Sequence, residues 1–206
     1  MTITKLLFFI AFIGHLICWR CDWIITYTPA GRFTIDDLQD NNKLSETFKS
    51  SSLKRPLHSM LFGVLALAMI FCGYLSLYEW MKQYSMMYAA IIMTSAIAFI
   101  VPGTAHHIFC GVVEWLYIRL GRTEEARKVI LELFKKTSVT MIVCYLGLLV
   151  FSLSFFIAVV FGITPLPRWV CAFNILPIFI VLSPFRIAGT GNIAGAVMFA
   201  GLFFLI

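Results

Sequence analysis

The sequence predicts an all-α, polytopic integral membrane protein with six transmembrane helices and one interfacial amphipathic helix. Of its 206 residues, 61% are hydrophobic and only 13% are charged, and the mean hydropathy is +0.92. Soluble domains carry about a quarter charged residues and under half apolar ones. A soluble fold of this length still exposes about a third of its unfolded surface, so it could not hide this much apolar side chain. Soluble, disordered and disulfide-scaffold folds are therefore excluded.

The six predicted spans follow from apolar runs of about 20 residues, the length that crosses a hydrocarbon core of about 30 Å. No small-residue cleavage site follows the first run, so we expect it to be a retained span rather than a signal peptide. The third run is too long for one simple crossing, and Pro102-Gly103 within it predicts a kink or a break near 102–103. The predicted spans are residues 3–27, 56–80, 84–118, 138–162, 166–182 and 187–206.

Two further segments complete one transmembrane domain over residues 1–206. Residues 28–55 form the longest hydrophilic loop, which is too short to be a domain of its own. Residues 123–136 begin with Thr123, a residue type that caps helices, followed by an acidic first turn. Apolar residues then recur on one face, at Ala126, Val129, Ile130, Leu133 and Phe134. This one-sided pattern predicts an amphipathic helix lying along the membrane interface.

The basic residues predict the orientation. Alternating spans place three bases on one side, Lys5, Lys82 and Arg168. The opposite side receives twelve, namely Arg32, Lys43, Lys49, Lys54, Arg55, Arg119, Arg122, Arg127, Lys128, Lys135, Lys136 and Arg186. The positive-inside rule then makes loop 28–55 cytoplasmic and both termini non-cytoplasmic. The formal charge of +6 is explained by topology, so we expect the lipid bilayer as partner, and no nucleic acid.

Ionisable residues inside spans are costly and mark functional sites by default. Two predicted helices carry such residues at spacings of i, i+3 and i+7, which places each set on one helix face. The sets are His15, Cys18 and Asp22 in the first span, and His107, Cys110 and Glu114 in the third. Both sets lie in the predicted cytoplasmic half of the bilayer, so the sequence predicts one shared polar pocket.

The candidate catalytic residues of this pocket are Asp22, His107 and Glu114, acting as proton-transfer groups or as metal ligands. Second-line members, chosen for the same depth, are His15, His106, Asn192 and Arg186. A structural interpretation stays open for each group. Asp22 could pair with Arg20 at the interface, the histidines could satisfy carbonyls freed by the Pro102 break, and Glu114 could face headgroups.

Metal and redox chemistry are weaker interpretations. A zinc site would combine His15 or His107 with Asp22 and Glu114, but the sequence has neither a His-x-x-x-His nor an HExxH motif. We therefore predict no metal site and name no cofactor. Cys18-Trp19-Arg20-Cys21 has the spacing of redox pairs, but it lies on the predicted cytoplasmic side, where disulfides are not maintained.

Small residues in the last span predict close helix packing. Gly191 with Gly195, and Ala196 with Ala200, form small-xxx-small faces, which bury the span in the bundle or form a dimer contact. The oligomeric state stays open. For function, we expect an enzyme that acts on a lipid or another small hydrophobic ligand at the polar pocket. The alternatives are a transporter of a small molecule and a non-catalytic scaffold or assembly protein.

Overall fold

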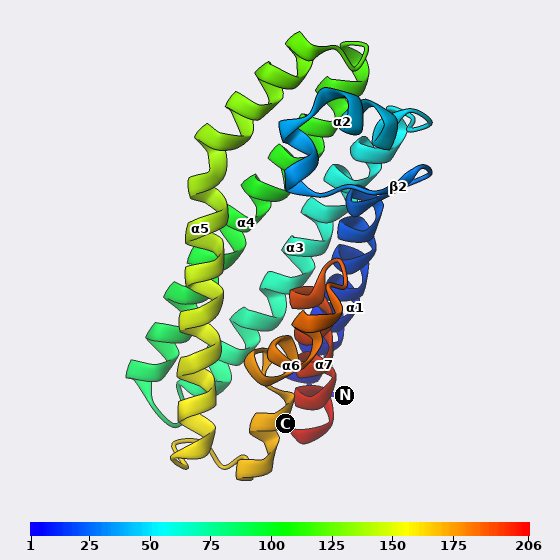
Figure 1. Cartoon of the computed structure of the whole chain (residues 1–206). Coiled ribbons are helices and arrows are strands. Elements are labelled where there is room, and N and C mark those ends of the chain that lie inside the picture. Colours follow the sequence, from blue (N-terminus) through cyan, green and yellow to red (C-terminus); the bar gives the residue numbers. More distant parts are fainter.

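Four long helices form the body of the protein in the computed structural model, which describes residues 1–206 (Figure 1). They are α1 (Ile3–Thr26), α3 (Lys54–Met81), α4 (Met86–Arg119) and α5 (Glu124–Val160). Each contains an apolar stretch long enough to cross a membrane. The two termini lie towards one end of the bundle, and α2 (Asn41–Phe48) lies at the other. The chain is therefore an almost entirely helical bundle whose long helices alternate in direction.

The C-terminal quarter is built from shorter pieces. They are η2 (Arg168–Phe173), α6 (Ile175–Leu182), η3 (Ser183–Phe185) and α7 (Thr190–Leu205). At 1.5 Å per residue, the 8 residues of α6 and the 16 of α7 fall short of the roughly 20 residues that a complete crossing needs. Hydropathy predicts full spans over 166–182 and 187–206, so the count of six complete spans is not confirmed.

Prolines explain why this region is broken up. Pro167 precedes η2, and Asn174 then caps α6 by accepting a hydrogen bond from the Leu176 amide at 2.9 Å. Pro177 fits the first turn of α6, where no amide donor is needed, and Pro184 starts the η3 turn. The resulting α6–α7 hairpin reaches only part of the way along the bundle, beside α1 (Figure 1).

A cap covers the end of the bundle away from the termini. It consists of the two-stranded hairpin β1 (Tyr27–Thr28) and β2 (Gly31–Arg32), the short helix η1 (Ile35–Gln39) and α2. Two arginines hold it by donating to cap carbonyls, Arg122 of the α4–α5 turn to Phe48 at 2.9 Å and Arg127 of the first turn of α5 to Leu38 at 2.8 Å. The cap and the helix ends share an apolar cluster of Leu38, Leu44, Phe48, Val113, Tyr117, Ile118, Ala126 and Ile130.

The amphipathic segment 123–136 differs from its prediction. It is the first part of α5 and runs without a break into the apolar part, so it is not a separate helix in the membrane plane. No helix-breaking residue separates the two parts, and the Thr137 hydroxyl donates to the Leu133 carbonyl within the helix at 2.8 Å. Ile130 is buried against the cap, whereas Val129 is exposed.

The predicted break at 102–103 is also absent, because α4 continues through Pro102. The backbone of α5 packs tightly against the turn that precedes this proline. A Cβ added at Gly147 would lie 2.6 Å from the Phe99 nitrogen and 2.7 Å from the Ala98 carbonyl carbon. Pro102 has no amide hydrogen, so one hydrogen bond is missing from this turn of α4. The close packing of α5 stabilises the helix at this point.

The outward faces of the long helices are apolar, while many polar side chains point inward. Exposed residues of α5 include Val139, Ile142, Val143, Leu146, Leu149, Val150, Leu153 and Ile157. Large exposed apolar surfaces of this kind are typical of contact with a membrane. Buried polar residues include His15, Ser59, Ser95, His107, Glu114, Ser152 and Asn174. The bundle interior is therefore where a polar site is found.

Candidate functional site

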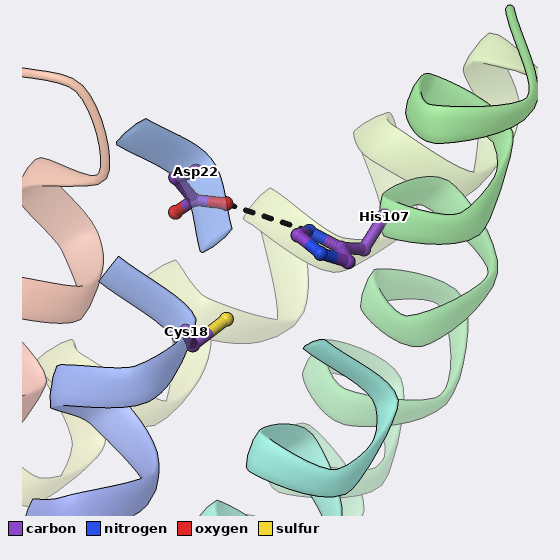
Figure 2. Close-up of side chains that lie close together, drawn as sticks. All are labelled: Cys18, Asp22 and His107. Carbon is purple, nitrogen blue, oxygen red and sulfur yellow. Dashed lines mark ion pairs between the residues drawn. The ribbon is translucent and has the colours of Figure 1, made fainter. Parts of the chain in front are cut away.

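The centre of the site is a contact between α1 and α4. Asp22 Oδ1 of α1 lies 3.4 Å from His107 Nδ1 of α4 (Figure 2). The His107 ring passes close to α3 at Gly63, where an added Cβ would lie 2.1 Å from His107 Nε2. Glycine at position 63 therefore makes the space through which His107 reaches Asp22.

The second ring nitrogen of His107 is fixed by α3. Nε2 lies 3.0 Å from the Ser59 carbonyl oxygen and 3.4 Å from the Ser59 hydroxyl. That hydroxyl donates its own hydrogen to the Cys21 carbonyl at 3.0 Å. Because a carbonyl oxygen can only accept, Nε2 is the nitrogen that carries a hydrogen. In the neutral ring, Nδ1 then presents a lone pair towards Asp22.

The other carboxylate oxygen of Asp22 is held by α7. Asn192 Nδ2 donates to Asp22 Oδ2 at 2.7 Å, and Asn192 Oδ1 lies 3.0 Å from His15 Nδ1. His15 therefore donates to Asn192, and the polar chain runs from His15 through Asn192 and Asp22 to His107. Gly195 gives His15 its space, since a Cβ there would lie 2.3 Å from the imidazole Cε1.

A cavity of about 410 Å³ adjoins this chain. Cys18, Asp22, His106, His107, Thr190 and Asn192 are among its polar lining, and Leu67, Phe99, Leu148 and Phe179 are among its apolar lining. The Asp22 side chain keeps 26% of its surface exposed, so the carboxylate is accessible from the cavity. A cavity of this size, lined by both polar and apolar side chains, suits a small ligand with an apolar part.

The structure brings together only part of the predicted set. Asp22 and His107 meet, and His15 joins through Asn192. His106 lines the cavity, but its Nε2 lies 3.5 Å from Cys110 Sγ one turn along α4. Asp22 contacts His107, whereas Arg20, its suggested partner at the interface, lies over the Trp23 ring at 4.3 Å.

Two predicted members lie elsewhere. Glu114 is buried, its Oε1 has no hydrogen-bond partner, and it does not line the cavity. It follows His107 by seven residues, which corresponds to about 10.5 Å along a helix axis. Arg186 is exposed at the end of η3 in the left-handed region, with φ of 51°, and is also absent from the cavity wall.

The site also includes residues for which the sequence predicted no chemical role. Cys18 lies one turn before Asp22 on α1 and points towards the same space (Figure 2). The sequence placed Cys18 on the same helix face as Asp22, and its i, i+4 spacing to Asp22 is the signal for a joint role of the two side chains. Ser59 contributes through its carbonyl and Gly63 through its missing side chain, and a single sequence gives no signal for either role.

These features define the class of the protein: a helical bundle with four apolar helices that could cross a membrane and a polar centre inside. The chain belongs to a family of unknown function, DUF6796, whose family model matches residues 1–206. No curated protein and no solved structure matches the chain.

Proposed function

We propose that the chain is a multi-pass membrane protein with four complete crossings and a membrane-embedded α6–α7 hairpin. The apolar outer faces of the long helices support the crossings, and the shortness of α6 and α7 supports the hairpin. At about 1.5 Å per residue, the 34 residues of α4 and the 37 of α5 exceed the thickness of a hydrocarbon core. Their ends therefore project from the membrane and carry the cap.

The cap end faces the cytoplasm in this proposal. Most of the basic residues lie at this end of the bundle, in the cap, in the α4–α5 turn or in the adjoining ends of the long helices. Arg32 and Lys43 lie in the cap, Arg122 in the turn and Arg127 in the first turn of α5. An excess of Lys and Arg is typical of cytoplasmic loops. Both termini then lie on the non-cytoplasmic side, and the basic cap attracts anionic lipid headgroups.

The proposed activity is that of an enzyme acting on a lipid or another hydrophobic substrate. The observation that carries it is the 3.4 Å contact between Asp22 and His107 in the wall of the cavity. A carboxylate beside an imidazole can transfer protons or polarise a reacting group. Placing ionisable groups inside a membrane costs free energy, so such groups are usually kept for a function. A reaction catalysed in the cavity is the function proposed for Asp22 and His107.

The geometry supports a separate role for each of the two residues in this proposal. Ser59 holds the hydrogen on His107 Nε2, so Nδ1 is free to accept a proton from a hydroxyl group or a water molecule. Asp22 then stabilises the imidazolium that forms. Asn192 keeps the Asp22 carboxylate in place through Oδ2.

The test compares the lipid composition of host membranes that contain the wild-type protein or the Asp22→Asn variant. We expect the wild type to deplete one lipid class and accumulate its product, and Asp22→Asn to leave both at the level of an empty host. Glu79→Gln is the matched control, because Glu79 is exposed near the end of α3 and pairs with Lys82 at 3.0 Å. An unchanged lipid profile with the wild-type protein would overturn the proposal and favour a transporter or a scaffold.

A further inference from the structure

Three donor atoms of different chemistry meet at the cavity wall. One ligand atom each from Cys18, Asp22 and His107 lies within 4.8 Å of the others (Figure 2). The set supplies one sulfur, one oxygen and one nitrogen, which are the donor types that zinc takes in proteins. Cys18 and Asp22 come from successive turns of α1, and His107 comes from α4.

The orientation of His107 leaves a place for a cation between the two side chains. Its Nε2–H group points at the Ser59 carbonyl, so in the neutral ring Nδ1 and Asp22 Oδ1 are two acceptors facing each other. A protonated ring would normally approach a carboxylate to about 2.7–2.9 Å. The observed separation is 3.4 Å. Zinc bonds of about 2.0–2.2 Å at tetrahedral angles separate a nitrogen and an oxygen ligand by about 3.3–3.5 Å.

His107 and Asp22 make the hydrogen bonds that metal-binding side chains usually make to their surroundings. Metal-bound histidines usually donate their second N–H to a carbonyl or a carboxylate, and bound carboxylates are themselves hydrogen-bonded. Here His107 contacts the Ser59 carbonyl, and Asn192 donates to Asp22 Oδ2. Oδ1 and Nδ1 are therefore the atoms that remain for an ion.

We propose that Cys18, Asp22 and His107 bind a zinc ion whose fourth coordination position opens into the cavity. All three residues line the cavity, and a site with three protein ligands and an open position is typical of catalytic zinc. The ion would polarise an oxygen atom of a substrate or of a water molecule at that position. With zinc bound, the Nδ1 lone pair would be a metal ligand, so the ion would replace His107 as the group that activates this oxygen. This chemical role rests on the proposed function, whereas the binding of zinc does not.

The missing histidine motifs do not argue against this site. A His-x-x-x-His motif serves to place two ligands on one helix face, one turn apart. Cys18 and Asp22 have the same i, i+4 spacing with different donor atoms. The third ligand comes from a distant part of the chain, which is why no local sequence motif reveals the set.

The test measures zinc bound to the full-length protein in detergent, after removal of metal with a chelator and dialysis against Zn²⁺ alone. We expect about one ion per chain, and at least about tenfold weaker binding in Cys18→Ser, Asp22→Asn and His107→Gln. Cys72→Ser is the matched control, because Cys72 is on α3 outside the site and its thiol bonds to the Ala68 carbonyl. Wild-type protein that takes up no zinc, or variants that bind it as tightly, would overturn the proposal.

A second measurement does not depend on how the variants fold. Co²⁺ added to the metal-free wild-type protein should give a thiolate-to-cobalt charge-transfer band, because Cys18 is a ligand, and Zn²⁺ should displace it. Absence of the band contradicts ligation by Cys18. Zinc binding without any change in host lipids would leave the metal site standing and remove the proposed activity. A lipid change by chelator-treated, zinc-free protein would support the proposed activity and remove the chemical role proposed for the ion.

Discussion

At the residue scale, glycines decide whether the polar chain can form. Gly63 and Gly195 occupy the positions where the imidazoles of His107 and His15 cross a neighbouring helix. At both positions, a histidine ring from another part of the same chain fills the space that a side chain would occupy. For Gly195, this shows a packing role within the bundle.

Replacing Gly63 by Ala should displace His107. The new Cβ would lie 2.1 Å from Nε2, and overpacking of this kind costs about 1–3 kcal/mol. We expect a lower thermal midpoint in detergent and a loss of the lipid change in host membranes. Gly191→Ala is the control, since its Cβ would meet only Leu148 at 4.0 Å. Equal midpoints for the two variants would show that His107 does not occupy this space.

At the element scale, a buried carboxylate holds two parts of the cap together. Asp37 of η1 accepts a hydrogen bond from the Thr34 amide at 2.7 Å and pairs with Lys43 of α2 at 2.7 Å. Burial of the carboxylate acts to raise the pKa of Asp37, but the hydrogen bonds from Lys43 and Thr34 outweigh it. The pKa therefore lies below its ordinary value.

This lowered pKa predicts how the stability of the cap depends on pH. A carboxyl group with a depressed pKa in the folded state stabilises that state above its unfolded pKa of about 4, and the contribution disappears as the pH falls through the folded pKa. The protection of the amide hydrogens of residues 34–48, measured relative to the exchange of an unfolded chain at the same pH, should therefore be high near neutral pH and fall in acid. In Asp37→Asn, we expect faster exchange at neutral pH and a smaller acid response. An acid response as large as that of the wild type would exclude Asp37 as its source.

Because α5 is one continuous helix packed under the cap, substitutions at the neighbouring residues Val129 and Ile130 should have different effects. Ile130 is 1% exposed in the apolar cluster under the cap, whereas Val129 is 53% exposed. Ile130→Asp should release the cap, because burying an unpaired carboxylate costs at least about 2 kcal/mol. Val129→Asp should be nearly neutral. Proteolysis of residues 28–53 measures the release, and equal sensitivity of the two variants would instead fit a helix buried in the membrane interface.

At the scale of the whole molecule, the sequence predicted the class of fold and part of the site. Two of the residues on the i, i+3, i+7 faces, Asp22 and His107, meet in the structure. Glu114 shares that face of α4, but it lies two turns closer to the cap. Hydropathy counted residues 166–206 as two spans because it does not register the turns that prolines impose. The role of Ser59 depends on a tertiary contact of its carbonyl and could not be predicted locally.

The orientation is open to a direct test with a reporter fused after Ile206. We expect activity from a reporter that works only on the non-cytoplasmic side, because the termini lie opposite the basic cap. A second fusion within residues 28–53 should report the cytoplasm. Cytoplasmic activity at the C-terminus would reverse the proposed orientation.

The central claim is that Asp22 and His107 act as one reacting unit, and a double-mutant cycle on the rate of lipid conversion tests it most directly. Each of Asp22→Asn and His107→Gln should lower the rate by about 10²–10⁴-fold. Because residues of one unit are strongly non-additive, the double variant should be no slower than the slower single variant. Glu79→Gln should keep the wild-type rate. Fold-losses that multiply in the double variant, or a wild-type rate in either single variant, would contradict the claim.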